Sequence, residues 1–393
     1  MESSKTPSLM TGKPSGLPPA SLYIHVPFCS KKCPYCHFFV LPDSSDNQAF
    51  FLKALHKEWL LKAPLFAKKE IVSIYFGGGT PSLLPASAIE MILDWIKKGP
   101  APISSHVEIT LEANPEKTDK TSMQNFLKAG INRISLGIQS FDDDLLKTLG
   151  RTHGSLQAKQ AVLSVFEAGI KNISIDLMYE LPNQTIAQWE RSVKEATTLP
   201  ITHLSLYNLV FEPGTVFYKK KDLLSKNLPS NDEALTMLNF AVDHFTAKNL
   251  HRYEISAFAL KGFHSVHNTG YWTARPFLGL GPSAFSYFEG RRFRNVPHLK
   301  KWASFLEEGK PSEDFEEKLD PAASQRELFA VEIRLLEGIN LTLFEKTNGQ
   351  LFPELNDSIT SLLSKGLLKK LGPQISLTEE GLKFYDSVAI ELI

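Results

Sequence analysis

Apolar and polar positions alternate along most of this chain with two different periods. Between residue 21 and about residue 207, short apolar runs are separated by longer stretches in which apolar positions recur three or four residues apart. The first pattern is typical of buried strands and the second of amphipathic helices. The apolar runs predict six strands, at residues 22–26, 72–76, 107–111, 133–138, 173–177 and 203–207.

The stretches between these strands carry helix signals. In residues 46–62, Phe51, Leu55 and Trp59 fall on one helical stripe, and Asp46 stands where an N-cap is expected. After the second strand, apolar positions at residues 89–96 repeat the same spacing. We therefore expect each strand to be followed by a helix.

A short internal repeat supports this alternation. KAGINRIS and EAGIKNIS match 39 residues apart, and each reads as a helix end, a glycine C-cap (Gly130 or Gly169) and the next strand. Such units indicate a parallel sheet with helical crossovers. Six units are too few for a closed eight-stranded barrel, so we expect an α/β fold with an open (β/α)6 partial barrel. A doubly wound sheet is the alternative.

The chain divides into four parts by its pattern. Residues 1–20 are rich in Ser, Pro and Gly and predict a disordered tail, and residues 21–209 carry the partial barrel. Residues 210–309 form an aromatic-rich extension without a clear period. Residues 310–393 predict two helices, a Gly-Pro turn between two short strands and a last helix, which is typical of a winged-helix-like module.

Charge and hydropathy limit the partners of the protein. Lys+Arg and Asp+Glu both number 43, and residues 310–393 carry 9 Lys+Arg against 15 Asp+Glu. A net negative module does not suit a phosphate backbone, so we expect no nucleic acid and interpret the module as a structural lid. The N-terminal tail has no apolar run typical of a signal peptide, and no stretch reaches the length of a transmembrane helix. We expect a cytoplasmic protein with no integral membrane segment.

The cysteines carry the strongest chemical signal. The three in the chain, Cys29, Cys33 and Cys36, stand in one C-x3-C-x2-C stretch. Three thiolates are one ligand short of a closed iron–sulfur or zinc site, so an iron–sulfur cluster held by them would keep one iron open for a small molecule such as S-adenosylmethionine. A zinc site with His37 as fourth ligand is the alternative, although adjacent residues rarely both reach one tetrahedral metal.

Polar or glycine residues also stand at the carboxyl ends of the next four predicted strands. A GGGTP segment at residues 77–81 follows the second strand, Glu112 and Gln139 end the third and fourth, and Asp176 lies near the end of the fifth. In parallel α/β barrels these ends meet at the edge where functional residues gather. Glycine backbone can approach a ligand closely, carboxylates accept hydrogen bonds from hydroxyls or amines, and Arg151 can pair with a carboxylate. The alternative for the glycines is a tight turn, and the alternative for the charged residues is a structural ion pair.

Five segments in this order carry a family resemblance: SLYIHVPFCSKKCPYC, YFGGGTPSLL, LEANPEK, INRISLGIQSFDDDLLKTLGRTHG and ISIDLMYELPNQT. With them, the chain resembles the coproporphyrinogen III oxidase-like branch of the radical SAM superfamily from about residue 21 through the C-terminal module. The resemblance implies that Cys29, Cys33 and Cys36 hold a [4Fe–4S] cluster. It also implies a set of residues around S-adenosylmethionine: Tyr23, Tyr35, Gly78, Gly79, Thr80, Glu112, Gln139, Arg151 and Asp176.

Two features favour one function within this branch. The oxygen-independent coproporphyrinogen III oxidases (dehydrogenases) carry a further cysteine two positions after the third, where this chain has Phe38. The heme chaperones of the branch lack that cysteine and carry an HNxxYW motif, which is intact here. The resemblance thus implies a heme chaperone that delivers heme to acceptor hemoproteins, possibly respiratory ones, and that forms a homodimer in some states. The motif residues that would bind heme are His267, Asn268, Tyr271 and Trp272.

Alternatives stay open at this point. An imidazole can ligate heme iron and aromatic rings offer a flat apolar surface, but the motif could instead pack the open side of the barrel. Because the residues around S-adenosylmethionine are intact, an enzyme of porphyrin biosynthesis, the coproporphyrinogen III oxidase, is the alternative function.

One departure from the family pattern is Glu180, where relatives usually have glycine before Leu-Pro.

Overall fold

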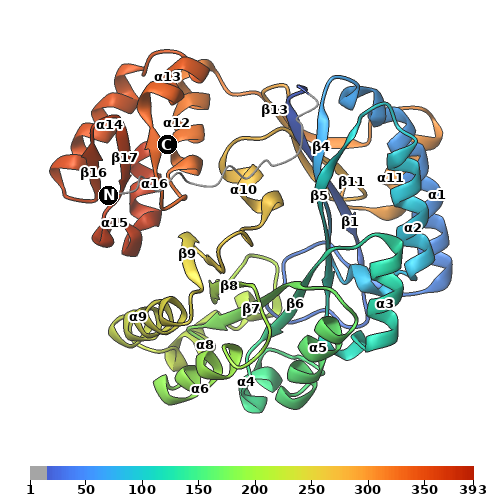
Figure 1. Ribbon diagram of the computed structural model, residues 1–393, viewed down its shortest axis with the longest axis horizontal. Helices are drawn as coiled ribbons and strands as arrows, with labels where there is room; N and C mark the ends of the chain where they lie inside the picture. The colour runs from blue at the N-terminus through green and yellow to red at the C-terminus, as the bar shows by residue number, and fades with distance from the viewer. Residues whose placement is uncertain (1–15) are drawn as a thin grey trace.

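The computed structural model describes residues 16–393 and shows an α/β fold around one large mixed sheet (Figure 1). The predicted tail lies mostly outside the described residues, and the first strand begins at Pro19, inside the predicted tail boundary. The sheet has 12 strands in the order β14-β13-β12-β11-β1-β4-β5-β6-β7-β8-β10-β9.

The centre of this sheet contains all six predicted strands, paired in parallel. They are β1 (Pro19–Val26), β4 (Glu70–Gly78), β5 (Ile103–Ala113), β6 (Arg133–Gln139), β7 (Asn172–Tyr179) and β8 (His203–Asn208). The prediction of strand–helix units in series is therefore confirmed.

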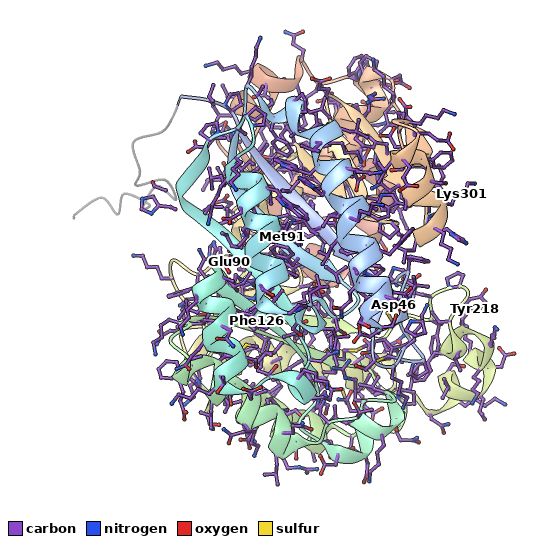
Figure 2. The ribbon with its side chains drawn as sticks, turned by 90° about the vertical axis from the view of Figure 1, so that its right-hand side faces the viewer. Asp46, Glu90, Met91, Phe126, Tyr218 and Lys301 are labelled. Atoms are coloured by element: carbon purple, nitrogen blue, oxygen red, sulfur yellow. The ribbon has the colours of Figure 1, made fainter. Side chains whose placement is uncertain are left out.

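The crossover helices lie along the outer side of the curved sheet rather than on both of its faces (Figure 1). They are α1 (Ser45–Lys62), α2 (Ala86–Lys97), α3 (Lys120–Ala129), α4 (Asp143–Thr148), α5 (Ser155–Glu167) and α6 (Ile186–Ala196). The apolar stripes of α1, α2, α3, α5 and α6 pack against the strands in one continuous core, whereas Leu145 of α4 belongs to a separate small cluster. Figure 2 shows α1, α2 and α3 side by side on this outer face, which leaves the inner side of the sheet for function.

Two local details differ from the sequence expectations. The side chain that caps α1 belongs to Ser44, which accepts from the backbone N–H of Asn47, whereas Asp46 lies within the first turn. Gly130 does cap α3 with φ 113°, but the cap of α5 is Ala168, and Gly169 lies one residue beyond with φ 104°. In each case the prediction was wrong by one or two residues, because several neighbouring residues can fill a cap position.

The region predicted to be irregular extends the sheet at both ends. At one end β10 and β9 continue antiparallel from β8, and at the other β11 pairs in parallel with β1 and is followed by three antiparallel strands. The strands are β9 (His251–Glu254), β10 (Ala257–Ala259), β11 (Phe277–Leu280), β12 (Phe285–Phe288), β13 (Arg291–Asn295) and β14 (Glu313–Glu317). Between and around them lie the helices α7 (Val216–Lys219), α8 (Lys221–Leu224), α9 (Asn231–Ala247), α10 (Val266–Trp272) and α11 (Leu299–Glu307).

The C-terminal part forms a second unit with a hydrophobic core of its own. A three-stranded sheet in the order β15-β17-β16 is surrounded by helices. The elements are α12 (Pro321–Glu332), β15 (Ile339–Asn340), α13 (Leu341–Asn348), α14 (Pro353–Ser364), β16 (Leu368–Leu371), β17 (Gln374–Leu377), α15 (Glu379–Lys383) and α16 (Tyr385–Leu392).

The remaining short elements frame the loops. β2 (Phe28–Cys29) and β3 (Leu41–Pro42) pair with each other on either side of the cysteine loop. The 3-10 turns are η1 (Ala63–Phe66), η2 (Pro81–Leu83), η3 (Pro115–Lys117) and η4 (Ser225–Asn227). No helix in the described part of the chain is both long and apolar enough to cross a membrane.

Candidate functional site

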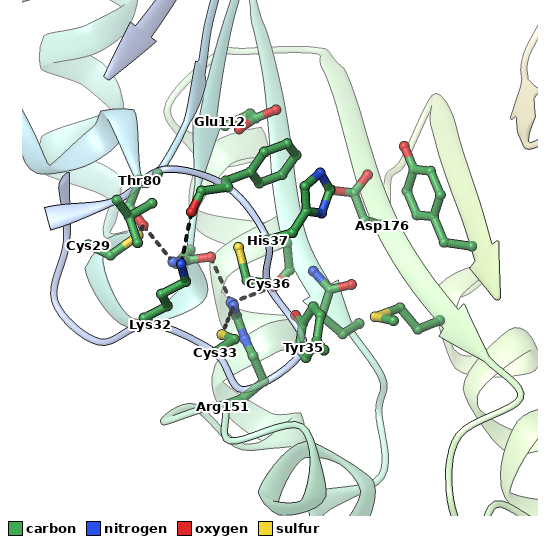
Figure 3. A pocket seen from close by; sticks show the side chains of 18 of the residues that line it. Cys29, Lys32, Cys33, Tyr35, Cys36, His37, Thr80, Glu112, Arg151 and Asp176 are labelled. Carbon is green, nitrogen blue, oxygen red and sulfur yellow. Dashed lines mark hydrogen bonds between the residues drawn. The ribbon is translucent and has the colours of Figure 1, made fainter. Parts of the chain in front are cut away.

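A cavity of about 440 Å³ opens at the carboxyl ends of the parallel strands (Figure 3). It gathers the three cysteines and every other predicted residue around S-adenosylmethionine except Tyr23. Its lining includes Cys29, Cys33, Cys36, Tyr35, Gly78, Gly79, Thr80, Glu112, Gln139, Arg151 and Asp176. We call it the cofactor cavity.

The three thiols share one wall of this cavity and are free and half-buried. The Cys29 thiol lies 3.6 Å from the Thr80 hydroxyl, and Arg151 Nη1 donates to Cys33 Sγ at 3.5 Å. Burial raises the pKa of Cys29 and of Cys36, and the neighbouring thiols act in the same direction. In residues 16–393, no three His, Cys, Asp or Glu side chains are already arranged as a metal-binding group.

The glycine loop after β4 allows close packing beneath the cysteine loop. A Cβ on Gly78 would lie 2.6 Å from the His25 ring, and one on Gly79 would lie 2.5 Å from the Phe28 carbonyl oxygen. The N–H groups of Gly79 and Thr80 donate to the Val26 and Phe28 carbonyls at 2.9 and 2.7 Å. These glycines are therefore required by packing against β1 and β2 as well as by the cavity.

Two carboxylates face the cavity from β5 and β7. Burial raises the pKa of Glu112 to about 7, although Glu112 accepts from the Tyr75 hydroxyl at 2.8 Å. Burial likewise raises the pKa of Asp176 to about 6. Neither carboxylate has an ion-pair partner among the described residues. The alternative of a structural ion pair does not apply to either residue in this structure, which leaves both free to accept from a ligand.

Arg151 is held in place by neutral acceptors. Its Nη2 donates to Asn114 Oδ1 at 2.6 Å and to the Gly137 carbonyl at 2.8 Å. Asn114 in turn donates to Thr80 at 3.0 Å, so it connects the glycine loop to the arginine. Sequence reasoning missed Asn114, although its place in the loop directly after a strand end was the available signal.

One further residue that the sequence analysis did not single out, His25, shapes the cysteine loop. His25 Nε2 donates to the Phe39 carbonyl at 3.0 Å, so its Nδ1 accepts from the Tyr23 hydroxyl at 3.1 Å. Burial lowers the pKa of His25 to about 4, which keeps the ring neutral. Tyr23 thus lies below the cofactor cavity, stacked on Tyr75, and anchors the loop indirectly. His37 lines the cavity with its ring 4.7 Å from that of Phe38.

The HNxxYW motif forms α10, away from the cofactor cavity. His267 is 1% exposed, and its two ring nitrogens are hydrogen-bonded to Ser73 Oγ and Tyr271 Oη, both at 2.9 Å. Burial lowers the pKa of His267 to about 3. The Asn268 backbone N–H donates to the Ser265 hydroxyl oxygen, which caps the helix. In this arrangement neither nitrogen of His267 is available to a metal.

The last residues of the motif face a different part of the molecule. The Arg334 guanidinium lies over the Trp272 ring at 4.2 Å, and Tyr271 and Trp272 line a second cavity, which shares no lining residue with the first. The four motif residues are therefore brought together on one short helix, between the sheet and the C-terminal unit.

Comparisons with known proteins agree with the geometry. The family model described as the radical SAM superfamily matches residues 23–196. The chain is 33% identical to the heme chaperone HemW of Bacillus subtilis, over 92% of this chain and 96% of that protein. It is 34% identical to the heme chaperone HemW of Haemophilus influenzae, over 95% and 97% of the two chains. Among solved structures, the Escherichia coli coproporphyrinogen III oxidase HemN, a radical SAM enzyme, superposes with a TM-score of 0.83 at 22% identity, covering 96% and 90% of the two chains.

Proposed function

Because this chain belongs to the radical SAM superfamily and, within it, to the heme chaperone HemW family, we propose that it binds heme and passes it to acceptor hemoproteins. The observation that carries the proposal is the identity of about one third with heme chaperones over nearly the whole of both chains. The likeness to HemN, at 22% identity, supports the fold alone.

A [4Fe–4S] cluster fits the donor set on the cavity wall. Cys29, Cys33 and Cys36 are the only cysteines of the chain and all line one cavity, so they would hold three irons and leave the fourth open. When bound, such a cluster supplies an open iron for S-adenosylmethionine. Arg151, beside Cys33, would offset part of the negative charge of the thiolates.

The cavity also suits S-adenosylmethionine. Glu112 and Asp176 form no ion pair among the described residues, so they would accept hydrogen bonds from ribose hydroxyls or from the amino group. Gly78, Gly79 and Thr80 would offer close backbone contact, with Tyr35 and Gln139 completing the lining. Tyr23 lies below the cavity and would contribute indirectly, because its hydroxyl donates to His25, which holds the cysteine loop.

In the HNxxYW motif, the residues that would contact heme are Tyr271 and Trp272. Tyr271 and Trp272 provide aromatic surface at the second cavity, while the Asn268 backbone N–H donates to Ser265, the N-cap of α10. His267 would ligate heme iron only after losing the hydrogen bond to Ser73 or to Tyr271. In the geometry described here it instead holds Tyr271 in place.

We also propose a fold type for the C-terminal domain, a cellular location, acceptor proteins and an oligomeric state. We interpret residues 310–393 as containing a winged-helix-like domain, because from α12 onward helix, strand, two helices and a β16–β17 hairpin follow one another in that order. A unit packed beside α10 would act as a lid. We place the protein in the cytoplasm, with respiratory hemoproteins as acceptors and a homodimer as one functional state.

The coproporphyrinogen III oxidase reaction is the second candidate, favoured by the complete cofactor cavity. Phe38 argues against it, because that position carries the further cysteine of the dehydrogenase pattern and its side chain is 48% exposed, at the cavity.

One experiment separates the two functions. Anaerobically reconstituted protein is titrated with heme by absorbance and, separately, incubated with reductant, S-adenosylmethionine and coproporphyrinogen III. We expect stoichiometric heme binding, transfer to an apo-hemoprotein and no protoporphyrinogen. Turnover without specific heme binding would establish the enzyme instead.

A further inference from the structure

The second and third cysteines stand at the two ends of one tight turn. The Cys36 N–H donates to the Cys33 carbonyl at 3.1 Å, across Pro34 and Tyr35. We call residues 33–36 the cysteine turn. Its shape sets the separation of two of the three thiols that would hold a cluster. A short turn has few contacts of its own, so its shape depends on the residues that pack against it.

The helix α7, from a distant part of the chain, packs against the cysteine turn. The Phe217 backbone N–H donates to the Pro34 carbonyl at 2.9 Å, and the centroids of the Phe217 and Tyr35 rings are 6.1 Å apart. Gly150, with φ 72°, also lies against the turn, because a Cβ there would come within 2.7 Å of Pro34 Cδ. The cysteine turn is therefore held by α7 and by the loop after α4.

Phe217 is the residue of α7 that points into the protein. It is 5% exposed, whereas its neighbours Val216 and Tyr218 are 48% and 45% exposed. The Thr215 hydroxyl caps the helix by accepting from the Tyr218 N–H at 3.1 Å. The Phe217 ring belongs to a small apolar cluster that is separate from the main core and that also contains Leu145, Leu149, Met178, Leu181 and Leu209. This ring therefore fixes α7 to the rest of the molecule.

The same apolar cluster lies behind one wall of the cofactor cavity. Met178 and Leu209 belong to the cluster and Tyr35 packs against it, and all three also line the cavity. Phe217 is not one of the lining residues. It would therefore act on a cofactor only through the cysteine turn and the wall that it supports.

We propose that α7 holds the cysteine turn in the shape that a [4Fe–4S] cluster requires, and that Phe217 is the positioning residue. With the turn held, Cys33 and Cys36 keep a fixed separation. Residues that orient metal ligands typically change metal affinity by roughly 10–100-fold when they are replaced. This role rests on the part of the proposed function that assigns a cluster, and it adds the element that keeps the cluster in place.

The test compares two buried phenylalanines that pack against different parts of the molecule. Phe217→Ala removes the ring beside Tyr35. Phe344→Ala is the matched control, because Phe344 is 4% exposed and its ring centroid lies 5.4 Å from that of Phe329, in the C-terminal unit. Tyr218→Ala removes the exposed ring next to Phe217, and Phe217→Leu keeps an apolar side chain in the small cluster.

A second pair of variants changes the turn from another contact. Gly150→Ala puts a methyl group against Pro34, while Gly366→Ala places the same group at φ 68° with no atom within 4 Å. The two changes carry the same backbone strain, and they differ in what the new Cβ meets.

Each protein is reconstituted anaerobically, and its iron and sulfide content is measured. The rate at which a chelator removes the cluster is followed by visible absorbance, and the reduced cluster is recorded by EPR. Thermal unfolding of the cluster-free proteins measures stability separately.

We expect Phe217→Ala to lose the cluster about tenfold faster than the wild type, and Gly150→Ala to lose it about threefold to tenfold faster. The EPR spectrum should change in both, because the cysteine turn changes shape. Phe344→Ala, Tyr218→Ala and Gly366→Ala should stay within about twofold of the wild-type rate with the wild-type spectrum, although Phe344→Ala lowers the unfolding temperature. Phe217→Leu should restore the rate to within about threefold.

Three results would contradict the role of α7. If the wild type takes up no cluster, the cluster assignment is wrong and this role with it. If the wild type holds a cluster that Phe217→Ala and Gly150→Ala lose at the wild-type rate, the cluster assignment stands and the role of α7 is wrong. Equal acceleration in Phe217→Ala and Phe344→Ala would also overturn it, because cluster loss would then follow overall stability.

Discussion

Two residues at the carboxyl edge of the sheet adopt left-handed backbone conformations that residues with a Cβ rarely take. Gln139 ends β6 with φ 69°, and Glu180 follows β7 with φ 58°. The left-handed region costs a non-glycine residue roughly 1–2 kcal/mol. Glu180 stands where relatives of this chain usually have glycine, so the departure noted in the sequence has a backbone explanation: the turn after β7 requires this conformation.

We therefore expect Glu180→Gly to raise the free energy of unfolding by about 0.5–1 kcal/mol, since relief of strain exceeds the added flexibility of glycine. The hydrogen bond that is lost, from Asn208 to Glu180 at 3.3 Å, lies at the surface. Urea unfolding of the cluster-free protein measures the change. The same exchange at Glu190, inside α6, should instead lower stability by about 1 kcal/mol. A loss of stability at both positions would contradict the strain argument.

At the scale of single elements, α10 is short and depends on one buried carboxylate. Glu108, on β5, accepts from the backbone N–H groups of Val266 and His267 at 3.0 and 2.9 Å, and it lies 3.9 Å from the Arg133 guanidinium. A negative charge at the first turn satisfies N–H groups that have no partner within the helix. A helix of seven residues has little stability alone, so this contact holds the HNxxYW motif against the sheet.

Glu108→Ala should lower the free energy of unfolding by about 3 kcal/mol, because it leaves two N–H groups without their acceptor and the buried Arg133 guanidinium without its ion-pair partner. Amide hydrogen exchange should accelerate at residues 265–272 before it does in β5 and β6. Glu354→Ala, at the exposed first turn of α14, is the control and should change stability by no more than about 0.5 kcal/mol. Unchanged exchange across α10 would show that the helix is held by other contacts.

At the scale of the whole molecule, the barrel and the C-terminal unit have separate hydrophobic cores and meet beside α10. The Leu336 N–H donates to the Tyr253 carbonyl at 3.0 Å. Arg334 lies over the rings of Trp272 and Tyr385 at 4.2 and 4.9 Å and 3.6 Å from Glu254. One guanidinium therefore joins the motif helix, the edge of the sheet and the last helix.

Arg334→Ala should weaken the docking of the C-terminal unit by about 2 kcal/mol, through loss of the cation–π contacts and of the partner of Glu254. Thermolysin should then cleave the connector between β14 and α12, at residues 318–320, faster than in the wild type. Arg326→Ala, on α12 and without these contacts, should leave the cleavage rate unchanged. Equal rates for all three proteins would mean that the docking depends on the apolar contacts alone.

The sequence by itself determined the central strands and the residues of the cofactor cavity. The period of apolar positions shows which side of a helix or strand is buried. The carboxyl ends of parallel strands share one edge of the sheet, so Glu112 and Asp176 could be placed at the same edge without coordinates. The strands of residues 251–317 escaped prediction because runs of three to five residues are too short to show a period.

Only the tertiary structure decided the positions of Tyr23, His267 and the second cavity relative to that edge of the sheet. Tyr23 belongs to the same strand as the cysteine loop, yet it lies under the cavity because its strand is paired on both sides and turns that side chain toward Tyr75. His267 resembles a metal ligand in sequence, but burial and two hydrogen bonds engage it inside the protein. The second cavity brings α10 together with α12, more than 50 residues further along the chain, and contacts at that separation leave no local pattern in the chain.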